Sequence, residues 1–278
     1  MGIQKTTKKD HKRLEGFLNG DILAYRHLDW NTPLNWIDDP TFFCLEEHGE
    51  IHACICAAQE TPESAWLRFF ASVRNEIYAE SWNELLMQAL DKLEVLGVRR
   101  LAALGLSHWF ETLLIDSGFS TSESVVVLEY GGELPFISGH DRNITIRIMV
   151  ERDLPTIFTI DRDCFPPIWQ NSLATLSKAY HLSAYNTVAL LNDTIVGYQI
   201  SSATSNLAHL ARLAVSPAHQ NQHIGFSLVA DMVNHFDSLA VWNFTVNTQS
   251  NNAASLNLYR KMGFSLTGEE IKVYQLDL

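Results

Sequence analysis

The chain has 278 residues, of which 46% are hydrophobic and 19% charged, a composition typical of a globular protein. Its formal net charge of −12 argues against binding to nucleic acid, because phosphate recognition relies on clustered Lys and Arg. No apolar run approaches the roughly 20 residues of a membrane span, and the basic N-terminal stretch lacks the apolar segment of a secretory signal. We therefore expect a cytoplasmic protein with no membrane or nucleic-acid partner.

The length suits two domains of about 140 residues each. The acidity belongs to the first of them, since residues 1–140 contain 21 acidic and 11 basic residues whereas residues 141–278 contain 11 and 9. The four cysteines, Cys44, Cys54, Cys56 and Cys164, lack the paired spacing of a zinc site. Reduced, buried thiols are therefore expected.

The first half contains a strand, helix, strand, helix and strand in the order TPESAWLRFFASV, AESWNELLMQALDKLEVLG, VRRLAAL, WFETLLIDSGF and SVVVLEY. The second half follows the same order. Aligning Phe119 with Phe264 places Gly118 on Gly263, and a shift of one residue sets residues 66–69 beside residues 210–213. Two similar domains in tandem are the simplest explanation.

Turn residues collect in GGELPFISGHDR, at residues 131–142, where the periodicity is lost. We therefore expect a first domain at residues 1–135, a linker at 136–142 and a second domain at 143–278.

The second half alternates strands and helices. Residues 144–150 alternate as a strand, residues 151–164 read as a helix that Pro166 and Pro167 end, and residues 172–181 read as a second helix. Strands at 187–191 and 195–203 form a hairpin across Asn192 and Asp193. A strand at 212–215, a helix, a further strand and helix, and a last strand pair ending at 273–276 complete the pattern. We predict an α/β fold of two tandem units, each a mixed, mostly antiparallel sheet flanked by helices.

The turn after the strand at 212–215 opens an amphipathic helix. A helix start exposes backbone N–H groups that no internal carbonyl satisfies, and its dipole adds partial positive charge, so it suits a pyrophosphate. His219 and His223 are spaced i, i+4, as in a zinc protease, but HQNQH lacks the glutamate of HExxH and has no evident third ligand. We therefore expect no metal site.

The stretch from His209 to Phe264 resembles the cofactor-binding core of the GNAT superfamily of N-acetyltransferases. The family pattern Q/R-x-x-G-x-G/A falls on residues 220–225, where Gly225 keeps the second glycine and His223 replaces the first. The amide of His223 survives this replacement, although the close approach that glycine allows does not. The resemblance implies that acetyl-CoA, as co-substrate, is bound by Leu213, Ala214, Val215, Gln220, Asn221, Gln222, His223, Ile224, Gly225 and Phe226.

The run from Asn252 to Phe264 is similar to the family's N-x-x-A-x-x-L-Y-x-K-x-G-F, with Ser255 in place of the alanine. The resemblance adds Asn252, Ser255 and Tyr259 to the cofactor-binding residues. It also implies that Tyr259 donates a proton to the departing coenzyme A thiolate, a role that its hydroxyl permits. Packing of the tyrosine ring, with no chemical role, is the alternative.

Two positions compete for the general base. Some members of the family carry a glutamate eleven residues before the Q/R of the turn, and His209 stands there. Others use a glutamate twelve residues before the tyrosine, where Asn247 cannot accept a proton. The unperturbed pKa of histidine suits proton transfer near neutrality, so His209 is the better candidate. The alternative is an ordinary strand histidine, with proton removal through water.

The first copy lacks these features. Its strand-to-helix turn has no glycine, Glu76 and Glu80 would repel a pyrophosphate, and Leu114 occupies the place of Tyr259. We therefore expect a degenerate copy with a structural role or a role in acceptor recognition.

The function implied by the resemblance is acetyl-CoA-dependent N-acetyl transfer, directly to a primary amine of unknown identity. The acceptor could be a small molecule or a peptide, and the acidic first domain favours a cationic one. The segment DRDCFPPIW, at residues 161–169, resembles the substrate-side loop of the RimI-like branch, and it could equally be a hydrophobic lid. A CoA-binding sensor without turnover and a transferase of another acyl group remain alternatives, and the chain could be a monomer or a homodimer.

Overall fold

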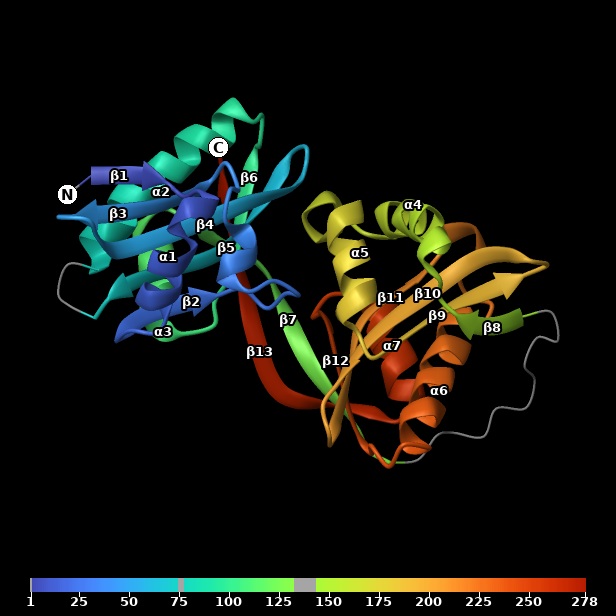
Figure 1. The fold of residues 1–278 in the computed structure, drawn as a ribbon. Coiled ribbons are helices and arrows are strands. Elements are labelled where there is room, and N and C mark those ends of the chain that lie inside the picture. Colours follow the sequence, from blue (N-terminus) through green and yellow to red (C-terminus); the bar gives the residue numbers. More distant parts are fainter. Residues whose placement is uncertain (1, 75–77, 133–143) are drawn as a thin grey trace. The chain divides into compact units, whose positions relative to one another are not determined.

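The computed structural model describes residues 2–74, 78–132 and 144–278 (Figure 1). Its contacts divide the chain into two compact units, the first made of Met1–Ser122 with Ile271–Leu278 and the second of Glu123–Glu270. The expected linker at 136–142 lies outside the described residues. No described helix combines the length and the apolar character needed to cross a membrane.

The first unit is built on a sheet with strand order β1-β3-β4-β5-β6-β13, and β2 pairs with β5. Its helices are α1 (His11–Leu18), α2 (Tyr78–Val95) and α3 (His108–Asp116). Residues on one stripe of α2 are buried, including Trp82, Leu86 and Leu93, because their helical spacing turns them all toward the sheet. The strands are β1 (Gly2–Lys5), β2 (Ile22–Arg26), β3 (Phe42–Glu47), β4 (Glu50–Thr61), β5 (Ser64–Val73), β6 (Arg100–Leu104) and the end of β13 (Phe264–Asp277).

The second unit has the strand order β7-β12-β11-β10-β9-β8. Its helices are α4 (Leu154–Cys164), α5 (Leu173–Leu182), α6 (Ile224–Asp237) and α7 (Ala253–Lys261). The strands are β7 (Ser120–Tyr130), β8 (Ile144–Ile148), β9 (Tyr185–Leu191), β10 (Thr194–Ala203), β11 (Leu207–Val215) and β12 (Asn243–Gln249). The mixed, mostly antiparallel architecture is as predicted, although β11 begins at Leu207 and the expected last strand pair is the single strand β13.

Local turn chemistry explains several element ends. Asn192 and Asp193 join β9 to β10 with φ values of 49° and 61°, and Asx residues tolerate this left-handed conformation better than most. Gly118 and Gly263, which the repeat aligns, end α3 and α7 with φ values of 86° and 90°. The tandem repeat therefore extends to the conformation of these glycines.

Each unit contains a strand from the other half of the sequence. In the second unit, β7 pairs with β12 from Val125↔Gln249 to Glu129↔Thr245. In the first unit, β13 pairs with β6 from Val273↔Leu104 to Asp277↔Arg100. The units therefore divide the chain differently from the boundaries expected from the repeat, because the last strand of each half completes the sheet of the other unit.

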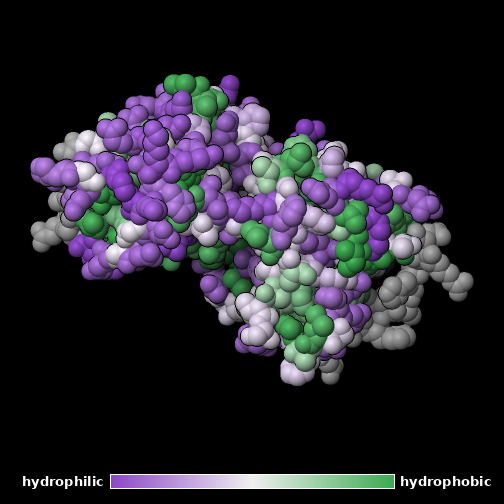
Figure 2. All heavy atoms as spheres, in the orientation of Figure 1, coloured by the Kyte–Doolittle hydropathy of each residue, from purple (hydrophilic) through white to green (hydrophobic). Residues whose placement is uncertain are grey.

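The cysteines and the surface agree with the composition. Cys44, Cys54 and Cys56 are buried, Cys164 is half-buried, and all four are free thiols. Burial raises the pKa of Cys54 and of Cys56, so both stay protonated. On the face drawn in Figure 2, hydrophilic residues cover most of the first unit.

Candidate active site

Strand β11 loses its partner on one side partway along its length. It pairs with β12 in parallel only from Leu207↔Asn243 to Leu210↔Val246. Beyond that point β12 continues alongside β7, while β11 stays paired with β10 as far as Val215↔Gly197. The register with β10 shifts at this point, where Ile200 pairs with Arg212 and Ser201 with Leu210, so Ala211 is the extra residue of a β-bulge on β11. Among the strands that the structure describes, none pairs with this edge of β11 beyond Leu210, which is called the open edge below.

The open edge presents the backbone of alternate residues. The Ser216 amide donates to the Val196 carbonyl on β10 at 2.8 Å. Because backbone groups alternate between the two edges of a strand, the amide of Ala214 also faces β10, whereas those of Leu213 and Val215 face the open edge. The carbonyl of Val215 also faces away from β10, since it accepts from Gln220 Nε2 at 3.0 Å and from the Cys164 thiol at 3.1 Å.

The open edge leads into the start of α6. The first helical bond runs from the Ser227 amide to the His223 carbonyl at 2.9 Å, so the amides of Ile224, Gly225 and Phe226 precede the internal bonding of the helix. His223 holds a left-handed conformation, with φ 60° and ψ 9°. This conformation explains why the family pattern has glycine here, since residues with a Cβ adopt it at a cost of roughly 1 kcal/mol.

Gly225 has a packing role. A Cβ at this position would lie 3.3 Å from Cδ2 of Leu258 and 3.7 Å from Cγ2 of Val215. The glycine therefore lets α6 approach α7 and β11 closely. A larger residue here would disturb the contact between the helices before it reached any ligand at the turn.

The start of α7 follows its sequence signature. The Asn252 side chain caps the helix by accepting from the Ser255 amide at 3.1 Å. Tyr259 is 4% exposed and packs its ring against Phe264, with the ring centroids 5.9 Å apart. Burial raises the pKa of Tyr259, which keeps its phenol protonated.

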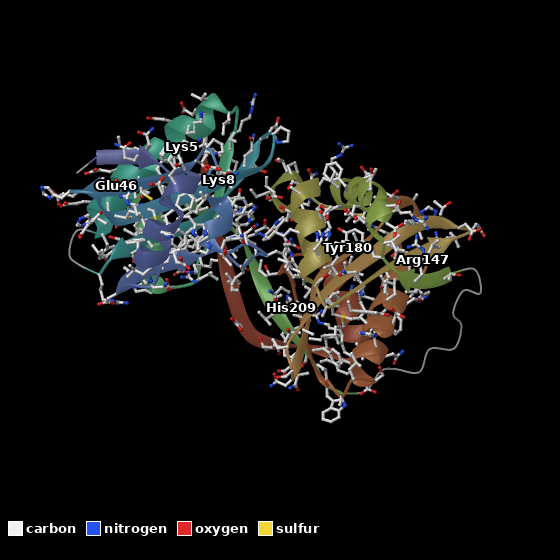
Figure 3. The ribbon with its side chains drawn as sticks, viewed as in Figure 1. Lys5, Lys8, Glu46, Arg147, Tyr180 and His209 are labelled. Carbon is white, nitrogen blue, oxygen red and sulfur yellow. The ribbon has the colours of Figure 1, made fainter. Side chains whose placement is uncertain are left out.

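His209 lies on β11 before the divergence, and Figure 3 labels it. Its Nδ1 is 2.9 Å from Oγ1 of Thr245 on β12. Burial lowers the pKa of His209, so the neutral imidazole predominates at pH 7. Asn247 lies two residues beyond Thr245 on the same face of β12, where it is exposed.

Sequence reasoning missed a buried ion pair beside the open edge. Asp161, on α4, is fully buried and pairs with Arg212 on β11, with Nε at 2.8 Å and Nη2 at 2.9 Å from its two oxygens. Tyr198 donates to the same carboxylate at 2.5 Å. One signal was available, because Asp161 follows Leu154 and Ile157 on the buried stripe of α4, and a carboxylate there requires a partner.

Arg212 also organises the segment after α4. Its guanidinium lies 3.5 Å from the centroid of the Phe165 ring and donates to the Trp169 carbonyl at 2.7 Å. The Trp169 indole donates to Glu123 of β7 at 2.7 Å. Because β12 separates β11 from β7, Trp169 is tied to strands on both sides of the divergence.

The family model described as "Acetyltransferase (GNAT) family" matches residues 154–264, which include this strand, turn and helix. The second half of the chain is a GNAT acetyltransferase domain. The chain is 23% identical over 121 residues to the ribosomal protein bS18-alanine N-acetyltransferase of Escherichia coli K12, a match covering 44% of this chain and 80% of that protein. This relative supports the RimI-like assignment of the second half.

Two further comparisons concern an antibiotic acetyltransferase and the tandem fold. Streptothricin acetyltransferase of Escherichia coli is 28% identical over 88 residues, which are 31% of this chain and only 51% of that protein. A solved tandem GNAT protein from the clavulanic acid biosynthesis pathway has a TM-score of 0.57 at 10% identity, with 88% of this chain and 86% of that chain covered. This structure supports a GNAT fold in both units.

The first unit has the same strand divergence, but the gap is closed. Strand β5 pairs with β6 in parallel only from Ser64↔Arg100 to Trp66↔Ala102. Beyond that point β2 pairs with the freed edge, from Arg26↔Phe69 to Ile22↔Val73 (Figure 1). Tyr25 on β2 accepts from the Leu104 amide of β6 at 3.2 Å and stacks on Phe110. The chain itself therefore occupies the edge that stays open in the second unit.

Two further differences expected of the first unit are seen in the structure, and a third position lies outside the described residues. Leu114, aligned with Tyr259, is fully buried and carries no hydroxyl. Glu80 lies in the first turn of α2, where it places negative charge at the helix start. Glu76 lies outside the described residues.

The described residues show no metal cluster, and one open hollow lies away from the predicted site residues. Across residues 2–74, 78–132 and 144–278, no three His, Cys, Asp or Glu side chains gather as metal ligands would. An open hollow of about 360 Å³ is lined by the ends of β8 and α5 and the start of β9, including Tyr180 (Figure 3). None of the predicted site residues lines this hollow.

Proposed function

We propose that the second unit transfers an acetyl group from acetyl-CoA directly to a primary amine. One observation carries this proposal: the open edge of β11 leads into the amide-rich start of α6. An open edge can bind an extended ligand by added β-structure, and a helix start can bind phosphate. The pantetheine and pyrophosphate of coenzyme A are joined in the same order.

The residues at the edge fit such a donor. The backbones of Leu213 and Val215 would bind the pantetheine amides, and residues 220–226 would bind the pyrophosphate. Asn252 and Ser255, at the start of α7, would complete the site. When bound, acetyl-CoA supplies an acetyl group activated as a thioester.

The chain's own groups provide the remaining chemistry. His209, whose pKa is lowered by burial, is neutral at pH 7 and can accept the proton of an incoming amine. A backbone N–H at the open edge can stabilise a developing oxyanion, as preorganised donors do. Tyr259 keeps its proton at neutral pH, because burial raises its pKa, and can donate it to the leaving thiolate.

Calorimetric titration with acetyl-CoA tests the donor site. Gln222→Glu places a negative charge on the exposed turn, and Gln4→Glu places the same charge on the exposed strand β1 as a control. We expect one binding site per chain, at least about 10-fold weaker binding in Gln222→Glu, and no change in Gln4→Glu. Equal affinity in all three proteins would exclude the turn as the phosphate site.

Release of free coenzyme A thiol in the presence of a panel of amines tests turnover. Tyr259→Phe should lower kcat by about 10-fold to 100-fold while leaving the Kd for acetyl-CoA within about 2-fold, because only the departing thiolate needs the phenolic proton. Binding without thiol release for any amine would favour a CoA-binding sensor, the alternative suggested by His223 and Asn247. A kcat unchanged in Tyr259→Phe would remove Tyr259 from the mechanism.

A further inference from the structure

Three neighbouring strands of the second unit place polar side chains in one row. His209 on β11 is paired with Thr245 on β12, and Thr245 is paired with Glu129 on β7. Side chains of directly paired residues lie on the same face of a sheet. The 2.9 Å contact between His209 and Thr245 confirms this direction for the first pair.

This face of the sheet is open although β12 is an interior strand. Glu129 and Asn247 are exposed, and His209 and Thr245 are half-buried. On the opposite face of the same strands, Leu128 and Val246 are buried in an apolar cluster with residues of α6 and α7. An antiparallel sheet can leave one face to solvent, and here that face is the one on which the candidate base His209 lies, so its polar side chains are accessible to a ligand.

The formal charge of these three strands is negative. Strands β7, β11 and β12 contain three residues that are charged at neutral pH, namely Glu123, Glu129 and Arg212. Arg212 is paired with Asp161, and Glu123 accepts from the Trp169 indole. Glu129 therefore adds a carboxylate to the row that contains His209, and such a field attracts a cation.

We propose that Glu129 binds a second ammonium group of the acceptor and thereby selects linear diamines over monoamines. This proposal rests on the proposed function, in which His209 receives the reacting amine. Neighbouring strands lie about 4.8 Å apart, so β7 is roughly 10 Å from β11, and the two side chains can reach toward each other across β12. The acceptor then carries its second charge several carbon atoms from the reacting nitrogen.

The proposal gives the first half of the chain a part in the reaction. Glu129 belongs to β7, which precedes the second half in the sequence and completes its sheet. The degenerate copy thus supplies a specificity residue through its last strand, although its own strand edge is closed.

A matched pair of amines tests the proposal. The ratio of kcat/KM for 1,4-diaminobutane to that for 1-aminobutane should be at least about 10, and it should fall toward about 1 in Glu129→Gln. Glu15→Gln removes an exposed charge from α1 and should leave the ratio unchanged. The preference of the native chain should also weaken between 50 and 300 mM salt, roughly the range in which exposed charges become screened.

Direct calorimetric binding of 1,4-diaminobutane separates this proposal from the proposed function, because it needs no acetyl-CoA. Diamine binding that is lost in Glu129→Gln would support this site, even if acetyl-CoA does not bind. Failure of acetyl-CoA to bind would refute only the transferase function. A diamine preference that survives Glu129→Gln, or failure of the native chain to bind the diamine, would overturn the role of Glu129.

Discussion

Each unit contains a strand that diverges from its parallel neighbour. The edge freed by this divergence is paired in the first unit and open in the second. In the first unit β2 pairs with residues 69–73 of β5 and fills the gap beyond Trp66. In the second unit, residues 212–215 of β11 stay paired with β10, and no described strand pairs with their other edge. The comparison shows that the edge proposed as the donor site in the second unit is covered, in the first unit, by one strand of the same chain.

The largest expected effect is a proline in the closed edge. Ser72 is fully buried on β5 and is paired with Ala53 on one side and Leu23 on the other. The Arg74 amide donates to the Asp21 carbonyl, so the amide of Ser72 also faces β2, because backbone groups alternate along a strand. Ser72→Pro should destabilise the first unit by about 3 kcal/mol or more, because proline removes a ladder hydrogen bond to β2 and its ring clashes with that strand. Urea unfolding followed by circular dichroism measures this change, and a loss below 1 kcal/mol would contradict the pairing with β2.

A proline in the open edge should act on ligand binding. The Leu213 amide faces away from β10, so Leu213→Pro removes no ladder bond and should weaken acetyl-CoA binding by about 10-fold or more, with little change in Tm. Ala214→Pro, one residue further, loses a bond to β10 and should lower Tm markedly. Equal losses of Tm in the two variants would show that the edge at Leu213 is not free.

The left-handed residue at the turn should give a smaller effect. His223→Gly removes the Cβ from a backbone with φ 60°, and should stabilise the second unit by about 0.5 to 1 kcal/mol. His223→Ala keeps the Cβ and should bring no such gain, which makes it the control. Thermal unfolding measures both variants. A gain in His223→Ala equal to that in His223→Gly would assign the effect to the imidazole instead of the backbone.

The smallest expected effect is a pH dependence that differs between the units. Burial lowers the pKa of His27 well below its usual value and that of His209 to a lesser extent. Below the ordinary histidine pKa of about 6.5, the unfolded chain takes up protons that the folded chain does not, so stability falls as the pH drops from 7 to 5.

Denaturant unfolding at several pH values measures this slope. His27→Gln should flatten it more than His209→Gln does, and substitution of the exposed His11 should leave it unchanged. A slope that survives both Gln variants would place the titrating groups elsewhere.

The sequence predicted those features that local chemistry determines. The hairpin at Asn192 and Asp193, the Asn252 cap and the breaker at Gly263 each depend on a few adjacent residues, and the structure confirms them. The helix start after Gln220 was also correctly placed. The roles proposed for His209 and Tyr259 depend on a bound substrate and stay predictions.

Long-range pairing explains what the sequence did not predict. The pairing of β2 with β5 and the exchange of β7 and β13 join residues far apart in the chain, and their alternating patterns would fit several neighbours equally well. The partners of Asp161 lie 37 and 51 residues away, so only its place on an apolar helix stripe pointed to a buried pair. The packing role of Gly225 requires knowledge of where Leu258 lies.

The placement of the last eight residues has a consequence for how the protein is made. Residues 271–278 belong to the first unit, where they pair with β6. During synthesis the first 122 residues leave the ribosome long before this strand exists, so the N-terminal sheet stays one strand short until residues 271–278 have been made. Because such distant contacts form slowly and an unpaired edge promotes aggregation, the N-terminal unit, although made first, is completed last.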